Sequence, residues 1–230
     1  MAIRSCAVIG LGLFGRKVAT TLADLGVEVL AVDRNADLVH AMGDRVASAV
    51  CADITDEKAL VESGVLAAEV AVVAIGENME SSILVTALLK KHGVRRIVAR
   101  SHSDLHALVL STVGAERTID PEEEMGVRLA QEIWAPDVHS RIRLTTGQEV
   151  LEIEAREPLV GRTIQDLKFR EKYRLNILAV KHRKSGAEAG GAASGFEVNK
   201  LPRPTDIVES WDVLVVVGDS ERVQQFLDLL

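Results

Sequence analysis

The chain is poor in aromatic residues and carries no excess of positive charge. Aromatic residues make up 3% of its 230 positions, so its cores must be built from aliphatic side chains. The formal net charge of −7 argues against a nucleic-acid-binding protein, which would normally present a basic face. No apolar run approaches the ~18 residues of a membrane-spanning helix, and the N-terminus lacks the apolar region of a signal peptide. We therefore expect no membrane insertion and a cytosolic protein.

Cysteine and histidine offer little chemistry. The two cysteines, Cys6 and Cys51, lie in apolar runs, where we expect small buried residues in a reducing compartment. The six histidines are scattered. His102 and His106 are expected to be exposed on one helix, and His182 to be solvated on a strand. We expect no metal site built from these residue types.

A glycine triplet near the start of the chain is the most informative motif. Gly10, Gly12 and Gly15 follow one apolar run, and a second apolar run ends at Asp33. Strand, glycine turn, helix, strand and carboxylate at this spacing are typical of a dinucleotide-binding unit. The first glycine allows the turn, the second lets the backbone approach a phosphate, and the third lets the helix pack closely. Asp33 is expected to accept hydrogen bonds from the ribose hydroxyls.

The motif selects adenosine but not one nucleotide. NAD, ATP, ADP and AMP share the adenosine half, so each is compatible with the motif. Asp33 disfavours NADP, because a 2′-phosphate would meet a like charge, although the neighbouring Arg34 weakens that argument. A Rossmann-like domain without a ligand is the alternative.

The first 120 residues alternate strand-like and helix-like segments. Strands are expected over residues 4–9, 27–32, 46–51, 70–75, 96–100 and 116–119. Helices are expected over residues 16–25, 56–63, 79–91 and 103–112. This succession predicts an α/β fold, with a Rossmann-type doubly wound parallel sheet over residues 1–120.

The rest of the chain changes character. A helix from Pro121 to about Trp134 is expected to form a crossover or linker over residues 121–140. A small α+β domain is expected over residues 141–230. Its strands are expected over residues 148–155, 176–183 and 213–217, its helices over residues 163–167 and 220–229, and a mobile hairpin loop over residues 184–195.

Further candidate site residues lie in the glycine turn or follow the expected strands, where ligands bind in such sheets. They are Leu13, Phe14, Arg34, Asp53, Ile54, Ile75, Gly76 and Arg100. Asp53 could accept from the adenine amino group or cap a helix. Arg100 could reach a phosphate or form a surface ion pair. Glu122 is the first of three glutamates at the expected start of a helix, and it could also hold a phosphate-bound cation.

The sequence favours a binding module over an enzyme. It contains neither a recognisable Ser-His-Asp arrangement nor a Tyr-x-x-x-Lys pair, and its second domain is small for a catalytic domain. An NAD-dependent oxidoreductase is one alternative. A redox-sensing transcriptional repressor is another, although the acidic composition argues against DNA binding.

Several segments together resemble the regulator of potassium conductance family, the cytosolic subunits of Trk- and Ktr-type potassium uptake systems. The matching segments are residues 8–15, 28–33, 72–76, 114–122, 161–167, 177–180 and 212–218. The resemblance covers essentially the whole chain in the domain order of the family.

The resemblance implies a nucleotide-binding N-domain, a swapped helix and a C-domain that can bind a second ligand. It implies homodimers assembled into an octameric ring on a membrane-embedded potassium-translocating subunit, peripheral to the cytosolic face of the membrane. ATP and ADP favour different ring shapes in Ktr-type members, and a carboxylate at the position of Glu122 helps hold a cation. We therefore expect ATP or ADP, with NAD, NADH or AMP as alternatives, and a divalent or monovalent cation. A channel or efflux partner is a further alternative.

Two positions depart from the family pattern. Leu13 stands where Ktr-type members often place an arginine that contacts the terminal phosphates. Residues 164–170 differ at two places from the motif through which some members bind cyclic di-AMP. We therefore do not expect cyclic di-AMP to bind.

Overall fold

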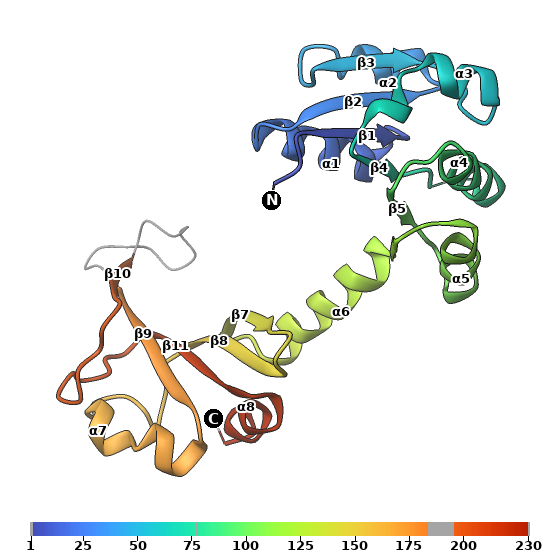
Figure 1. Cartoon of the computed structure of the whole chain (residues 1–230). Coiled ribbons are helices and arrows are strands. Elements are labelled where there is room, and N and C mark those ends of the chain that lie inside the picture. The colour runs from blue at the N-terminus through green and yellow to red at the C-terminus, as the bar shows by residue number, and fades with distance from the viewer. Residues whose placement is uncertain (1, 77, 184–195, 230) are drawn as a thin grey trace. The chain divides into compact units, whose positions relative to one another are not determined.

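The computed structural model describes residues 2–76, 78–183 and 196–229 (Figure 1). The chain divides into two compact units, Met1–Val127 and Arg128–Leu230. The hairpin loop expected at residues 184–195 lies outside the described residues. The domain limits expected from the sequence, at residues 120 and 140, stay a prediction.

A parallel six-stranded sheet forms the first unit. Its strands are β1 (Ser5–Ile9), β2 (Glu28–Asp33), β3 (Ser48–Cys51), β4 (Val70–Val73), β5 (Arg96–Arg100) and β6 (Arg117–Ile119). They pair in the order β3-β2-β1-β4-β5-β6, with every pair parallel. This is the doubly wound Rossmann order, which reverses between β1 and β4 and leaves a crevice at the carboxyl ends of the strands. The predicted fold class is confirmed.

Helices cover both faces of this sheet. They are α1 (Leu13–Asp24), α2 (Ala36–His40), α3 (Glu57–Glu62), α4 (Met79–Lys91) and α5 (Asp104–Val113), with a 3-10 turn at Val65–Ala67. Aliphatic side chains of α1 and α2 pack into one core, and those of α3, α4 and α5 pack into a second core on the other face. Four of the helices begin at a polar side chain that accepts a backbone N–H, namely Asn35, Asp56, Asn78 and Ser103.

The turn between β1 and α1 requires glycine at two positions. Gly10 has a φ of 95°, a left-handed conformation that side chains disfavour. A Cβ on Gly15 would lie 1.8 Å from the carbonyl oxygen of Gly10, so α1 can approach the turn only without a side chain there. A Cβ on Gly12 would meet nothing within 4 Å. The first and third glycines are therefore required by the fold, whereas the second is not.

Several expectations for this unit were wrong in detail. Helix α1 begins at Leu13, earlier than expected, because Gly12 takes the cap position. Cys51 is exposed, because β3 is an edge strand, whereas Cys6 is buried as expected. Burial raises the pKa of the Cys6 thiol to about 11.

The short helix α2 was not expected, since five residues are too few to show helical periodicity.

His106 is buried, contrary to expectation, with 1% of its surface exposed. It lies where α5 packs on α4, and its Nε2 is 2.9 Å from the Ser82 hydroxyl. Burial, and then the charge of the nearby His102, lowers the pKa of His106. The four-residue spacing of His102 and His106 predicted that they lie near each other. It did not show which face of α5 packs against α4.

Helix α6 (Pro121–Trp134) has the predicted bounds and leads into the second unit. The antiparallel sheet there contains β7 (Val138–Arg143), β8 (Gln148–Glu154), β9 (Asn176–Arg183), β10 (Phe196–Asn199) and β11 (Val213–Asp219), in the order β10-β9-β11-β8-β7. The helical segments are α7 (Ile164–Leu167), a π-helical turn (Phe169–Tyr173) and α8 (Ser220–Leu227). They share one core with the sheet. The small α+β domain is confirmed, but β7 and β10 were missed.

His182, on β9, is half-buried rather than solvated. Its Nδ1 lies 3.0 Å from Oδ1 of the buried Asp212. Burial raises the pKa of Asp212. The hydrogen bond from the Glu209 amide and the pairing with His182 lower it, but by less than burial raises it. The basic neighbours of His182 in the sequence gave no sign of this partner, which lies 30 residues away.

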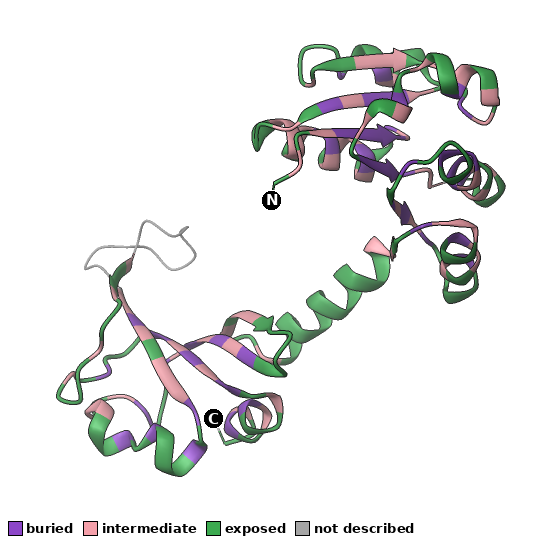
Figure 2. Cartoon of the chain, in the orientation of Figure 1, coloured by how far each residue is buried: buried purple, intermediate pink, exposed green. Residues whose placement is uncertain are grey.

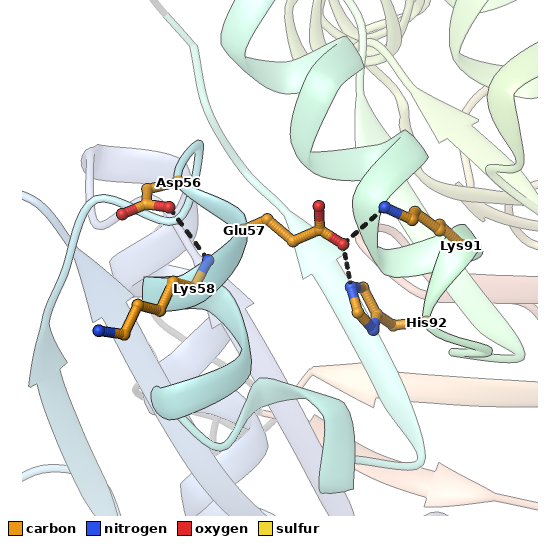
Figure 3. Close-up of polar contacts among 5 residues, drawn as sticks. All are labelled: Asp56, Glu57, Lys58, Lys91 and His92. Carbon is orange, nitrogen blue, oxygen red and sulfur yellow. Dashed lines mark hydrogen bonds and ion pairs between the residues drawn. The ribbon is translucent and has the colours of Figure 1, made fainter.

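One carboxylate connects α3 to the end of α4 (Figure 3). Oε1 of Glu57 lies 2.7 Å from Lys91 Nζ and 2.7 Å from His92 Nε2. These two hydrogen bonds lower the pKa of the Glu57 carboxyl. The ionised carboxylate is thus favoured by folding, so Glu57 stabilises the folded chain above its ordinary pKa.

We predict that Glu57→Gln lowers the melting temperature at pH 7. The difference should shrink as the pH falls below the ordinary glutamate pKa of about 4.3, and disappear once the pH is also below the lowered pKa of Glu57 in the folded chain. The matched control is Glu62→Gln on the same helix, whose exposed partner Lys58 is 3.9 Å away. A deficit of the Glu57 variant that is the same at pH 3 and pH 7 would contradict this assignment.

We predict that Gly15→Ala destabilises the chain by at least about 2 kcal/mol, because the overlap with the Gly10 carbonyl must be relieved by moving backbone. Gly12→Ala, in the same turn, should change the free energy of unfolding by less than about 1 kcal/mol. Urea unfolding of both variants checks this. Equal losses would show that α1 tolerates a side chain at Gly15.

Candidate functional site

A cavity of about 660 Å³ opens where β1, β2 and β4 end. This volume is within the range of small-molecule sites, about 300–1,000 Å³. The predicted site residues that line it are Gly10, Gly12, Leu13, Phe14, Asp33, Arg34, Asp53, Ile54, Ile75, Gly76, Arg100 and Glu122. Gly15 does not line it, since it packs beneath the turn. The strand order thus brings together residues that are far apart in the sequence, from Gly10 to Glu122.

Asp33 holds together the two loops at the centre of this cavity. Its Oδ2 accepts from the Leu11 amide at 2.6 Å, and its Oδ1 accepts from the Asn35 amide at 2.8 Å. The carboxylate at the end of β2 is therefore fixed in position beside the turn that follows β1. Each oxygen keeps lone-pair capacity, so the group can accept further hydrogen bonds from a bound ligand.

The start of α1 is open toward the cavity. Gly12 caps the helix without a side-chain hydrogen bond, and the first turn contains no acidic residue. The unpaired N–H groups of a helix start attract an anion. The space beside Gly12 leaves room for a ligand to approach the backbone. Leu13 is 84% exposed, so at this position the turn offers an apolar group in place of a side-chain cation.

Arg100 reaches into the cavity from the end of β5. Its guanidinium lies 5.8 Å from the centroid of the Phe14 ring and forms an ion pair with Glu122. A Cβ on Gly76 would come within 2.7 Å of Arg100 Nη1, so that glycine lets the guanidinium lie against the main chain. The Arg100 side chain is only 17% exposed. The expected ion pair exists, but it belongs to the cavity lining.

Asp53 has a local partner. Its Oδ1 accepts from the Thr55 hydroxyl at 2.7 Å and from the Thr55 amide at 3.1 Å. These two hydrogen bonds lower the pKa of Asp53 against the opposing effect of burial, and the charge of Arg34 lowers it a little further. Asp56, not Asp53, caps α3. Asp53 therefore closes a turn, and its second oxygen stays available.

Sequence reasoning missed several lining residues. They are Ile9, Val32, Asn35, Leu38, Ala52, Thr55, Ala74, Asn78, Ser81 and Val85. Asn35 and Asn78 could have been found, because each is a helix-capping residue type that follows an expected strand. Leu38 lies on α2, the helix that was not expected. The others are ordinary apolar or hydroxyl residues without a sequence signal.

Glu122 was expected to hold a cation. In this structure its carboxylate pairs with Arg100. Within residues 2–76, 78–183 and 196–229, no three His, Cys, Asp or Glu side chains are placed to hold a metal ion. A cation at Glu122 would need further oxygen ligands, such as those of a phosphate, and stays a prediction.

Known proteins match the chain over both units. The model of the TrkA-N domain matches residues 6–121, and that of the TrkA-C domain matches residues 149–230. Ktr system potassium uptake protein C of Bacillus subtilis (strain 168) is 36% identical over 220 residues, which cover 96% of this chain and 94% of that protein.

Two solved structures share the fold. The GsuK channel bound to NAD has a TM-score of 0.54 and 20% identity, covering 99% of this chain and 39% of that chain. The Shewanella denitrificans Kef CTD in its AMP-bound form has a TM-score of 0.50 and 22% identity, covering 57% of this chain and 80% of that chain. This chain thus spans well under half of the GsuK channel chain.

No helix in the described part of the chain is both long and apolar enough to cross a membrane. Both domain models match in the expected order, and a potassium uptake protein is similar over almost its whole length. The chain therefore belongs to the regulator of potassium conductance family, with a TrkA-N domain followed by a TrkA-C domain, and is homologous to the Ktr potassium uptake proteins.

Proposed function

We propose that this chain is a regulatory subunit that binds an adenine nucleotide and thereby gates a membrane-embedded potassium-translocating partner. The observation that carries the proposal is the cavity in which Asp33 and the open start of α1 face the same space. A ribose and a phosphate are adjacent in every nucleotide, as these two features are in the cavity. The subunit acts at the cytosolic face of the membrane through its partner, and no bond is made or broken.

Each part of the nucleotide is matched to a group in the cavity. Asp33 accepts from the ribose hydroxyls, while the phosphates lie against Gly12 and the N–H groups of α1, with Arg100 beside them. Apolar side chains of Ile54 and Ile75 offer surface for the adenine ring. The second oxygen of Asp53 is an acceptor for the adenine amino group. This arrangement uses the predicted residues without requiring a change of fold.

The family resemblance favours ATP or ADP as the ligand. The charges that line the cavity affect how well each nucleotide could bind. Leu13 supplies no cation for a terminal phosphate, so a triphosphate would depend on Arg100 and on a bound cation. The GsuK structure contains NAD and the Kef structure contains AMP, which keeps both ligands as candidates. Asp33 disfavours a 2′-phosphate, and so NADP, because of charge repulsion.

A second copy of the chain is the proposed partner of α6. Every residue of α6 after Pro121 is exposed, as its green ribbon in Figure 2 shows. Met125, Leu129 and Ile133 recur at intervals of four and form an apolar stripe. Such a stripe on a 14-residue helix calls for a protein partner. We propose a homodimer through α6, as the building block of a larger ring.

Gating then follows from unequal affinities. A nucleotide moves a ring between two shapes only by as much as it binds one shape more tightly than the other. A coupling of about 3 kcal/mol changes such an equilibrium more than a hundredfold. The similarity to the Bacillus Ktr protein supports a potassium uptake system as the partner.

Two substitutions test the binding site, measured by calorimetry with adenosine and AMP. Asp33→Asn keeps one oxygen for a backbone amide but turns an NH2 group toward the other amide and removes an acceptor for the ribose, so both ligands should bind at least about tenfold more weakly. Gly12→Ala adds a methyl group beside the phosphate, so AMP should bind more weakly while adenosine is unaffected. Unchanged affinities in both variants would place the ligand elsewhere.

Light scattering after size exclusion tests the pairing through α6. The chain should elute as a dimer or a larger assembly, because the apolar stripe is then covered. Ile133→Glu should shift it toward the monomer, whereas Gln131→Glu, on the opposite side of the same helix, should not. A wild-type chain that stays monomeric at all concentrations would refute the ring assembly.

A further inference from the structure

The ion pair between Arg100 and Glu122 lies in the cavity where the phosphate is placed. We propose that the nucleotide phosphate and the Glu122 carboxylate compete for the Arg100 guanidinium, so that binding releases the first turn of α6 from the cavity. This inference rests on the proposed nucleotide site and adds a regulatory ion pair to it.

Arg100 is held in place while its partner can leave. The guanidinium lies on the Phe14 ring and against the main chain at Gly76, with 17% of the side chain exposed. Glu122, in contrast, has 65% of its side chain exposed. A change of partner therefore frees the glutamate, and with it the first turn of α6, while the arginine can stay where it is.

A phosphate is the stronger partner for this guanidinium. An exposed carboxylate contributes little through an ion pair, because water and salt screen it. A phosphate offers several oxygens and more charge, and an arginine can bind it through two parallel N–H groups. The exchange is therefore favourable once Asp33 holds the ribose and the start of α1 holds the phosphate near Arg100.

The hydrogen bonds of the guanidinium are incomplete without a ligand. Nε of Arg100 is buried and has no hydrogen-bond partner in this structure. A buried N–H without an acceptor is unfavourable and uncommon in folded proteins. The pairing with Glu122 therefore does not satisfy the guanidinium, and a ligand oxygen that accepts from Nε would complete its hydrogen bonds.

The other charges in the cavity favour displacement of Glu122. Two arginines, Arg34 and Arg100, face three carboxylates, Asp33, Asp53 and Glu122, so the described lining is acidic. Asp33 and Asp53 are both engaged by backbone amides. Glu122 is therefore the carboxylate that is best able to move away when a phosphate enters.

The movement would act directly on α6. Glu122 lies in its first turn, where the Glu122 and Glu123 amides both bond to Asp120 Oδ1 at 3.1 Å. The same helix carries the apolar stripe proposed for pairing of two chains. Competition at Arg100 thus connects occupation of the cavity to the helix that is proposed to hold the assembly together.

The test measures AMP and adenosine affinities by calorimetry in a buffer containing EDTA. Glu122→Gln should bind AMP at least about fivefold more tightly than wild type, because the phosphate no longer displaces a charge. Adenosine affinity should not change, since adenosine has no phosphate. Glu123→Gln is the matched control, because it removes the same charge from the same turn but does not line the cavity.

Hydrogen exchange supplies a readout of the helix itself. In wild type, AMP should speed exchange at the Glu124 and Met125 amides, and adenosine should not. In Glu122→Gln these amides should exchange rapidly before any ligand is added. The same rates with and without AMP in wild type would contradict the release of α6.

The outcomes separate this inference from the proposed function. If AMP binds the wild type but Glu122→Gln does not tighten it, the competition is wrong and the nucleotide site stands. If the variant instead weakens AMP only when Mg²⁺ is present, Glu122 is a cation ligand and the competition is again wrong. If neither AMP nor adenosine binds the wild type, the proposed function fails together with this inference.

Discussion

The two hydrogen bonds of Asp33 are the interaction on which the site depends. They join the turn after β1 to the start of the loop after β2, and so fix the shape of the crevice. Gly10 and Gly15 make that turn possible, because the helix approaches the strand too closely for any side chain. The same carboxylate that organises the loops lines the cavity, so one group would supply both the structural support and the proposed recognition of the ribose.

The first unit separates rigid and adjustable parts. The buried aliphatic cores on both faces of the sheet, the glycine turn and the capped helices define a fixed frame. The ion pair at Arg100 is the proposed adjustable part, since its glutamate is exposed and belongs to α6. A regulatory protein needs both, because a ligand can shift an equilibrium only if some contacts differ between the two states.

The sequence predicted most of the fold for identifiable physical reasons. Buried parallel strands are continuous aliphatic runs, and helices that end at Gly26, Gly93 or Gly114 have clear limits. The fingerprint residues lie at strand ends, so topology alone brought Asp33 and Gly76 together. Partners distant in sequence were not predictable: the pairs His182 with Asp212, Glu57 with Lys91, and Arg100 with Glu122 depend on packing. Short segments such as α2 and β10 lack the length that periodicity requires.

The most direct test of the account is an NMR titration of the chain with adenosine. The Leu11 and Asn35 amides donate to the carboxylate that is assigned to the ribose, so their resonances report on that contact. The account predicts saturable shifts at these two amides, with smaller shifts around Ile54 and Ile75. Saturable shifts confined to other regions, or none at all at concentrations of adenosine near its solubility, would contradict it.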